Sequence, residues 1–278
     1  MKKVLLSIIL CATVPIWSQT TAIPDPNFEQ ALIDLGHDDV LDGQVLTNRI
    51  DTITNLSVHS KSISDLAGIE DFISLQTLTC SYNYLSELDI SNISSLTRLW
   101  CRRNEISNLT LGNLELLEWI FCDFNLLTEL NVGGLPELKY LRISHNPILF
   151  LNLSTNHNLH TLWCGGCQQL QCLNIANGND GLGIINALDN PNLSCIEVDD
   201  VAVAVENWTD SIDPQIIFSE DCDNPCSTSN ASLGGLHIIP KTVVKMFDLM
   251  GRETTFKPNT ALIYVYDDGS TEKVFSLE

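Results

Sequence analysis

The sequence has little positive charge. Only 14 lysine and arginine residues stand against 35 aspartate and glutamate residues in the 278-residue chain, which gives a formal net charge of −21. A phosphate backbone is bound by clustered cations, so this balance argues against nucleic acid as a partner and equally against an anionic membrane surface. Hydrophobic residues still make up 44% of the chain. The sequence therefore encodes a packed core and not a disordered acidic chain.

Long hydrophobic runs are also scarce. After the N-terminal stretch, no segment reaches the roughly 18 uncharged apolar residues that a membrane-spanning helix requires. Residues 1–19 are typical of a signal peptide, because Lys2 and Lys3 precede an apolar stretch that ends at Ser18 and Gln19. We therefore expect an exported protein, either secreted into the extracellular space or held at the outer cell surface, without a membrane span.

Residues 20–52 are predicted to form an N-terminal cap. Asp25 is a typical N-cap residue, and Pro26 suits the first turn of a helix. Three apolar residues then follow at helical spacing, and Gly36 provides a stop: Phe28, Leu32 and Leu35. This short helix should cover the open end of the structure that follows.

An acidic stretch after this helix allows two interpretations. Asp38, Asp39, Asp42 and Gly43 could belong to a calcium loop. Their spacing departs from the D-x-D-x-D-G pattern, and no glutamate follows at the offset of a bidentate ligand. A polar turn is the better interpretation, and no metal is assigned.

A repeat of 21 residues fills the middle of the chain. Leucines recur at this spacing without a slip, at Leu75, Leu96, Leu117, Leu138 and Leu159. Further positions follow in the same register: first Leu78, Leu99, Ile120, Leu141 and Leu162, then Cys80, Cys101, Cys122, Ile143 and Cys164, then Asn83, Asn104, Asn125, Asn146 and Cys167. One such unit cannot bury its own apolar face, so the units must stack.

This pattern resembles the short bacterial form of the leucine-rich repeat, over residues 53–200. The resemblance implies a solenoid poor in helix, a horseshoe or arc of short parallel β-strands with a helical cap at its N-terminus. Repeat positions 4 and 6 should point into the core. The asparagine at position 9 should form a ladder whose side-chain amides satisfy backbone groups where the chain turns.

Cysteines in an exported protein favour disulfides, but the register assigns most of them to the core. Cys80, Cys101, Cys122 and Cys164 occupy an inward position and should behave as small apolar residues. A zinc site is the alternative for a histidine- and cysteine-rich stretch: His157, His160, Cys164, Cys167 and Cys172. The repeat alone explains Cys164 and Cys167, so no metal or other cofactor is assigned.

Residues 201–226 are expected to close the solenoid. The segment around Leu193-Ser-Cys195, together with Trp208 and Phe218-Ser-Glu-Asp-Cys222, is similar to the closing cap of flavobacterial leucine-rich repeat proteins. That resemblance implies a Cys195–Cys222 disulfide. The pairing of Cys172 and Cys226 stays open.

The last part of the chain changes in composition. Residues 227–235 read as a linker, and residues 236–278 contain strand-like segments around Gly251 and Gly269 that predict a small β-unit. The tail is similar to the C-terminal sorting tails of Bacteroidota proteins, which implies export by the type IX machinery. It lacks the usual upstream Y-P-N-P strand, so a terminal β-hairpin with no transport role remains the alternative.

The outward positions of the repeat predict a binding face. In leucine-rich repeat proteins, positions 3, 5, 7 and 8 line the concave side. Here they carry aromatic residues and arginines, the residue types that dominate binding hot spots. The candidate binding residues are Arg98, Trp100, Arg102, Arg103, Trp119, Phe121, Tyr140, Arg142 and Trp163. Tyr82, Asp123, Phe124 and His145 occupy further positions of the same set. The alternative is that large side chains only pack across neighbouring strands.

Two classes of function follow from this face. An adhesin or recognition module would bind a protein or a polysaccharide there, since aromatic rings stack on sugars and arginines pair with carboxylates. A structural matrix component would use the repeats only as a stable acidic body. No catalytic residues are assigned, because Ser144 and His145 are sequence neighbours on a shallow surface beside Asp123 and no hydrolase or phosphate-binding motif is present.

Overall fold

The computed structural model describes residues 19–179 and 182–222, Cys226, and parts of the tail: 243–248, Arg252, Thr254, 261–266 and 271–275. The chain forms two compact units, residues 1–229 and 230–278. The predicted signal peptide before Gln19 and the predicted linker, residues 227–235, lie outside the described residues.

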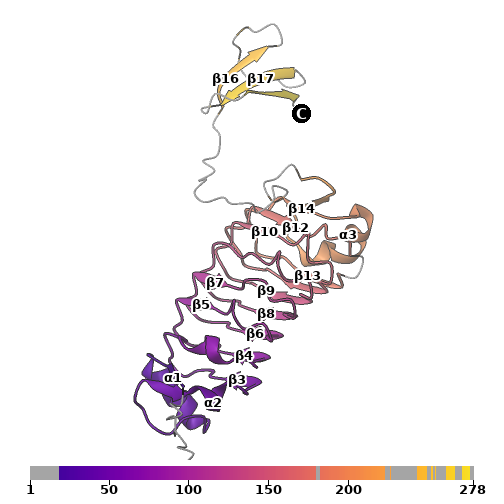
Figure 1. Cartoon of the computed structure of the whole chain (residues 1–278). Coiled ribbons are helices and arrows are strands. Elements are labelled where there is room, and N and C mark those ends of the chain that lie inside the picture. The colour runs from indigo at the N-terminus through magenta and orange to yellow at the C-terminus, as the bar shows by residue number, and fades with distance from the viewer. Residues whose placement is uncertain are drawn as a thin grey trace, which may run out of the picture. The chain divides into compact units, whose positions relative to one another are not determined.

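The N-terminal cap contains two helices, labelled α1 and α2 in Figure 1, and a small sheet. Strands β1 (Thr20–Ala22) and β2 (Gln44–Leu46) pair antiparallel, and they flank helix α1 (Pro26–Asp34) before the short helix α2 (Thr47–Ile50). Asp25 caps α1 as predicted, by accepting hydrogen bonds from the backbone N–H groups of Asn27 and Phe28. Phe28 and Leu32 are buried, whereas Leu35, at the C-cap, is exposed because it lies beyond the last turn that faces the repeats.

The acidic stretch after α1 is a polar turn whose backbone is hydrogen-bonded to a buried side chain of that helix. The buried Glu29 accepts hydrogen bonds at Oε1 from the backbone N–H groups of Asp42, Gly43 and Gln44, at 2.8, 2.6 and 3.1 Å. Gly43 has φ +85°, a conformation that glycine adopts without strain. The turn therefore binds to the helix by hydrogen bonds of its own backbone.

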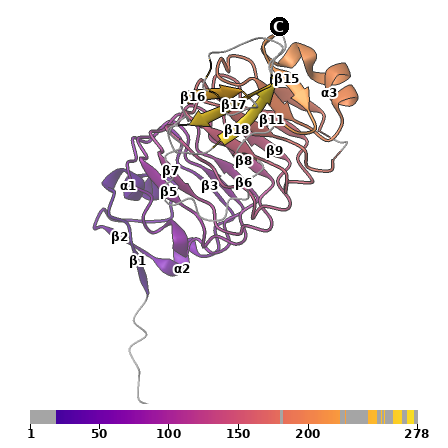
Figure 2. The same ribbon diagram turned by 90° about the horizontal axis from the view of Figure 1, so that it is seen from above.

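The repeats stack into a parallel β-solenoid, which confirms the predicted fold class (Figure 1, Figure 2). One side is a seven-stranded parallel sheet in the order β13–β11–β9–β8–β6–β4–β3. Its strands are β3 (Asn55–Ser57), β4 (Thr77–Thr79), β6 (Arg98–Trp100), β8 (Trp119–Phe121), β9 (Tyr140–Arg142), β11 (Thr161–Trp163) and β13 (Ile184–Asn186). The short 3-10 helix η1 (Ile69–Asp71) lies between β3 and β4 in the chain.

The second half of each repeat forms the opposite side. There β5 (Glu87–Asp89) pairs with β7 (Asn108–Thr110). A four-stranded parallel sheet has the order β10 (Phe150–Asn152), β12 (Cys172–Asn174), β14 (Cys195–Glu197) and β15 (Ile217–Ser219). The apolar core fills the space between the two sides, and Leu78, Leu99, Ile120, Leu141 and Leu162 in the middle of successive strands are all fully buried.

The cysteine and asparagine columns lie where the register predicts. Cys80, Cys101, Cys122 and Cys164 are fully buried free thiols, and burial raises the pKa of the Cys80 thiol to about 12. Asn125 shows the ladder: its amide donates to the carbonyls of Cys101 and Cys122, at 3.1 and 2.9 Å, and accepts from Ile106 N at 3.0 Å. Asn83, Asn104 and Asn146 repeat these bonds. Cys167 replaces the amide with a single thiol contact to Ile143 O.

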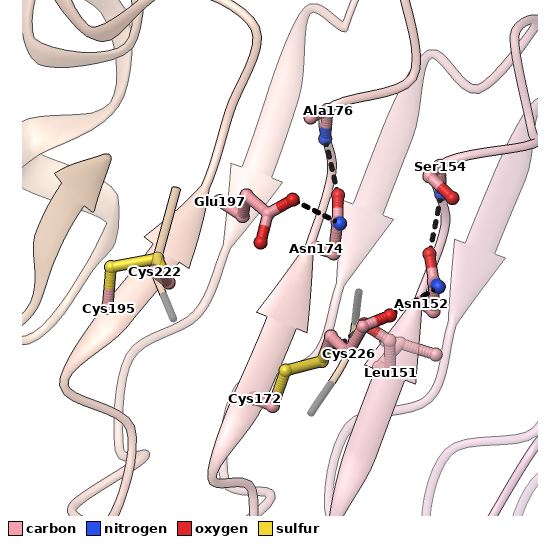
Figure 3. Close-up of a disulfide and its surroundings, with 10 residues drawn as sticks. All are labelled: Leu151, Asn152, Ser154, Cys172, Asn174, Ala176, Cys195, Glu197, Cys222 and Cys226. Carbon is pink, nitrogen blue, oxygen red and sulfur yellow. Dashed lines mark hydrogen bonds between the residues drawn. A yellow bond between two sulfur atoms is a disulfide. The ribbon is translucent and has the colours of Figure 1, made fainter. Parts of the chain in front are cut away.

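The C-terminal end of the solenoid carries helix α3 (Val201–Trp208), the 3-10 helix η2 (Thr209–Ser211) and two disulfides. One disulfide joins Cys195 to Cys222, the pair that the resemblance implied, and the other joins Cys172 to Cys226, which the sequence left open (Figure 3). Asn152 also donates a hydrogen bond to the carbonyl of Cys226 at 2.6 Å. These contacts attach Cys222 and Cys226 to strands β10, β12 and β14.

The second unit contains three antiparallel strands. These are β16 (Val243–Asp248), β17 (Ala261–Tyr266) and β18 (Thr271–Phe275), with β17 in the middle. In the part of the chain that the structure describes, no helix is long and apolar enough to cross a membrane.

Candidate binding surface

The outer face of the seven-stranded sheet carries the predicted binding residues. In each three-residue strand the middle side chain enters the core and the two flanking side chains point away from it, so the first and third residues of successive strands form two columns. Four consecutive strands, β6, β8, β9 and β11, supply the large side chains. We call the following nine residues the strip: Arg98, Trp100, Arg102, Arg103, Trp119, Phe121, Tyr140, Arg142 and Trp163.

In the first column, Trp119 and Tyr140 stack face to face. They are directly opposite each other on β8 and β9, their ring centroids lie 3.7 Å apart and their planes differ by 20°. Tyr140 also contacts His160 edge to face at 6.1 Å. Because the stacking vector runs from strand to strand, the ring faces are turned toward neighbouring rungs and the ring edges toward solvent.

The second column contains three rings and one guanidinium group. Trp100 and Phe121 stack at 6.3 Å between centroids. The Arg142 guanidinium carbon lies 5.5 Å from the Phe121 ring centroid and 4.0 Å from that of Trp163. Both distances are within the range of cation–π attraction.

A third column follows the turn after each strand. The residues at repeat position 8 have left-handed backbone conformations, with φ of 59° at Tyr82, 53° at Arg103, 58° at Phe124 and 56° at His145. Their side chains form a continuous pile: Arg103 lies 5.5 Å from the Tyr82 centroid and 4.3 Å from that of Phe124, and Phe124 stacks on His145 at 4.3 Å. His59 extends the pile beyond Tyr82.

Asp123 lies beneath the strip with no exposed surface. Its Oδ2 is 3.1 Å from Arg102 Nε, and its Oδ1 is 3.4 Å from Arg142 Nε. These contacts lack hydrogen-bond geometry, so the three charges are held by ion pairing alone. Burial lowers the pKa of Arg142, Asp123 opposes that shift, and Arg102 adds to it. The two arginines stay partly exposed, with 33% and 25% of their side-chain surface accessible.

The structure brings together eight of the nine predicted residues through ring, cation–π or ion-pair contacts. Arg98 is the exception: its side chain is exposed and makes no hydrogen bond or ion pair with the described residues. The sequence placed Asp123 on the outer face, whereas the structure buries it as the anchor of two arginines. Ser81, at the same repeat position one rung before Arg102, is also buried, so the position itself points partly inward.

The residues considered for catalysis or metal binding have other contacts. His145 stacks on Phe124, and Asp123 faces two arginines, so the two side chains are not directed at each other. His157 Nδ1 is bonded to the carbonyl of Asn177, and Cys172 is in a disulfide. Among the described residues, no three histidine, cysteine or acidic side chains are grouped as metal ligands.

Comparisons with known proteins identify the fold. No protein-family model matches the chain, and no curated protein matches it significantly. The functional domain of InlJ from Listeria monocytogenes, described as including a cysteine ladder, is 22% identical with a TM-score of 0.50 over 72% of this chain. This chain covers only 61% of that domain. The internalin InlF of the same species is 16% identical with a TM-score of 0.47, over 73% of this chain and 72% of its own. Internalin C2 is 20% identical with a TM-score of 0.42, over 73% and 97%. The fold is therefore a leucine-rich-repeat-like solenoid similar to that of the InlJ domain.

Proposed function

We propose that the chain is an exported binding protein that recognises a macromolecular ligand through the strip. The observation that carries this proposal is the distribution of large side chains. Three of the five tryptophans and four of the six arginines of the sequence fall on the strip. The neighbouring strands β3 and β4 of the same sheet present only Asn55, Ser57, Thr77 and Thr79.

The composition of the strip suits recognition better than structure. Tryptophan, tyrosine and arginine are the residues that contribute most binding energy in protein interfaces. The rings do pack on one another, as the structural alternative requires, but β4 forms the same ladder with two threonines. Ring packing is thus not needed to build the sheet, and half-buried rings and arginines gathered on one outer face favour a partner.

Export is part of the proposal and rests on separate observations. The N-terminal sequence is typical of a signal peptide, and two disulfides in the solenoid suit an oxidising compartment outside the cytoplasm. The tail's similarity to type IX sorting tails of Bacteroidota gives the expected export route. To test that route, secretion of a truncated chain that ends before residue 236 is compared with secretion of the full chain.

Binding is tested with the full chain and two variants. The triple variant Trp100→Ala, Trp119→Ala and Trp163→Ala removes the largest rings of the strip, and Thr77→Ala with Thr79→Ala is the matched control on β4. All three proteins are screened against panels of extracellular proteins and glycans, with circular dichroism to verify folding. We expect the triple variant to lose a ligand that the control retains. A ligand that the folded triple variant binds unchanged would contradict the proposal.

A further inference from the structure

The orientation of the rings bears on which ligand the strip can bind, provided that the proposed function holds. A sugar stacks on an open aromatic face, but several ring faces of this surface are already covered by a neighbouring side chain. Trp119 and Tyr140 cover each other, Arg142 covers Trp163, and Phe124 lies between Arg103 and His145. Aromatic edges carry partial positive charge, whereas the faces carry partial negative charge. Where a ring face is covered in this way, a ligand reaches the edge of the ring, and such edges attract electronegative groups.

The arginines add full positive charge in fixed positions. Arg102 and Arg142 both direct Nε toward Asp123, and no hydrogen bond or ion pair to the terminal nitrogens of either guanidinium is present among the described residues. Arg142 is also held against Trp163 and Phe121, and Arg103 is held between Tyr82 and Phe124. Side chains that are already ordered lose little conformational entropy when a ligand binds.

The buried carboxylate accounts for this order. A buried charge without partners is costly, so Asp123 keeps both guanidinium groups above it. The unit has two positive charges and one negative charge, which leaves a net positive centre on a chain of formal net charge −21. Such a centre complements carboxylates, and arginine can engage them with two parallel hydrogen bonds.

We propose that the ligand of the strip is a partner protein whose contacting surface carries aspartate or glutamate side chains. In this proposal Arg102 and Arg142 bind those carboxylates through their terminal nitrogens, and Asp123 is a positioning residue that sets the orientation of both guanidinium groups. Ring edges of Trp119, Tyr140 and Phe121 contact the same surface around the carboxylates.

The test uses a fluorescent oligo-glutamate peptide as the probe and the full chain as the binder. Fluorescence anisotropy is measured at about 150 mM salt, where a screening length of about 8 Å suppresses repulsion from the distant acidic surface. We expect Arg102→Ala and Arg142→Ala each to weaken binding about tenfold, since hydrogen bonds to charged groups contribute about 1.5 kcal/mol or more. Arg49→Ala is the matched control, because Arg49 is an exposed arginine of the N-terminal cap paired with Asp39.

Asp123→Asn separates positioning from simple charge. This variant makes the strip more positive, so attraction by net charge alone predicts tighter binding of the peptide. The proposal predicts weaker binding by several fold, because the arginines lose their anchor. Arg142→Lys, which keeps the charge but loses the planar fork, should also bind more weakly. Thermal melts of each variant identify any that are unfolded, and the conservative Arg142→Lys keeps the test decisive if Asp123→Asn does not fold.

Several outcomes would overturn the proposal. Affinity unchanged in both arginine variants, tighter binding by Asp123→Asn, or preference for an oligogalacturonate over the peptide would each do so, the last in favour of an acidic glycan. Self-association that the arginine variants abolish would instead identify a second copy as the occupant. The last outcome is a ligand whose binding is lost in the triple tryptophan variant but does not change with salt or with the arginine variants. In that case the proposed function stands and the proposal of an acidic partner is wrong.

Discussion

Two regions of one sheet share a scaffold but present different surfaces. Strands β3 and β4 carry asparagine, serine and threonine on the outer face, whereas β6, β8, β9 and β11 carry mainly tryptophan, phenylalanine, tyrosine and arginine there. Beneath both regions the inward leucines are fully or almost fully buried, and the asparagine ladder is continuous from Asn83 to Asn146. Identical interiors with different exteriors show that the solenoid does not dictate the outward side chains. Those side chains are the variable that function can set.

The largest expected effect tests whether the two interiors are equivalent. We call strands β3 and β4 the plain region. Leu78→Ala under the plain region and Leu99→Ala under the strip should each lower the free energy of unfolding by about 3 kcal/mol, because each deletes a fully buried leucine. Urea denaturation followed by circular dichroism measures both. A much smaller loss for Leu99→Ala would mean that the strip strains the rungs beneath it, and the comparison would fail.

The second effect tests the ladder. Asn125→Ala removes two donated hydrogen bonds and one accepted bond from buried backbone groups, so we expect a loss of about 2 kcal/mol. Cys167→Ala is the matched control at the same repeat position and should cost about 1 kcal/mol, since it removes one weak thiol contact. The same urea titration compares them. Equal losses would show that the ladder amides contribute less than their bonds indicate.

The third effect concerns Asp25, the N-cap residue of helix α1 in the N-terminal cap. Burial raises the pKa of Asp25, but hydrogen bonds from Ser64, Phe28 and Asn27 outweigh it, and the net pKa is lowered. A lowered folded-state pKa stabilises the fold above the unfolded value and loses that contribution as pH falls through the folded value. Asp25→Asn should therefore cost about 1 kcal/mol near neutral pH, because an amide NH2 group cannot accept the hydrogen bonds that Asp25 Oδ2 accepts from Ser64 and Asp65. This cost should shrink toward zero as the pH falls below the pKa of Asp25 in the folded protein.

Denaturation of both proteins across this pH range checks the sign. Lys61→Ala is a useful control, because Lys61 forms an exposed ion pair with Asp34 on the same helix. It should cost at most about 0.5 kcal/mol. A cost of Asp25→Asn that grows on acidification would contradict the assignment of the stabilising form as the carboxylate.

The smallest expected effect concerns the two outward threonines of β4. Thr77→Ala and Thr79→Ala should change stability by less than about 0.5 kcal/mol, because both side chains are half-buried and outward-facing. Any ligand of the strip should be bound with unchanged affinity. Isothermal titration provides the affinity, and a loss of binding would extend the contact surface to β4.

Much of the fold could be predicted because a repeat fixes the register. Leucines every 21 residues identify which side chains enter the core, and the same count placed Cys122 in the core and Trp119 on the outer face. The helix cap at Asp25 was predictable for a local reason, since capping depends on neighbouring residues only.

The register of the repeat does not predict how side chains on adjacent rungs contact one another. The register predicts that Asp123 lies on the outer face, but its burial depends on Arg102 one rung before it and Arg142 one rung after it. The stacking of Trp119 on Tyr140 likewise depends on side-chain torsions that a one-dimensional pattern does not contain. Cys172 and Cys226 are 54 residues apart, and their pairing depends on the path of the segment after β15.

Hydroxyl-radical footprinting of the protein with a ligand found in the screen is the most direct test that the strip is the binding face. The account predicts that bound ligand protects Trp100, Trp119, Tyr140 and Trp163 from oxidation. Tyr84, which is 60% exposed and outside the strip, should be oxidised equally with and without ligand. Protection of Tyr84 while the strip residues remain reactive would contradict the account.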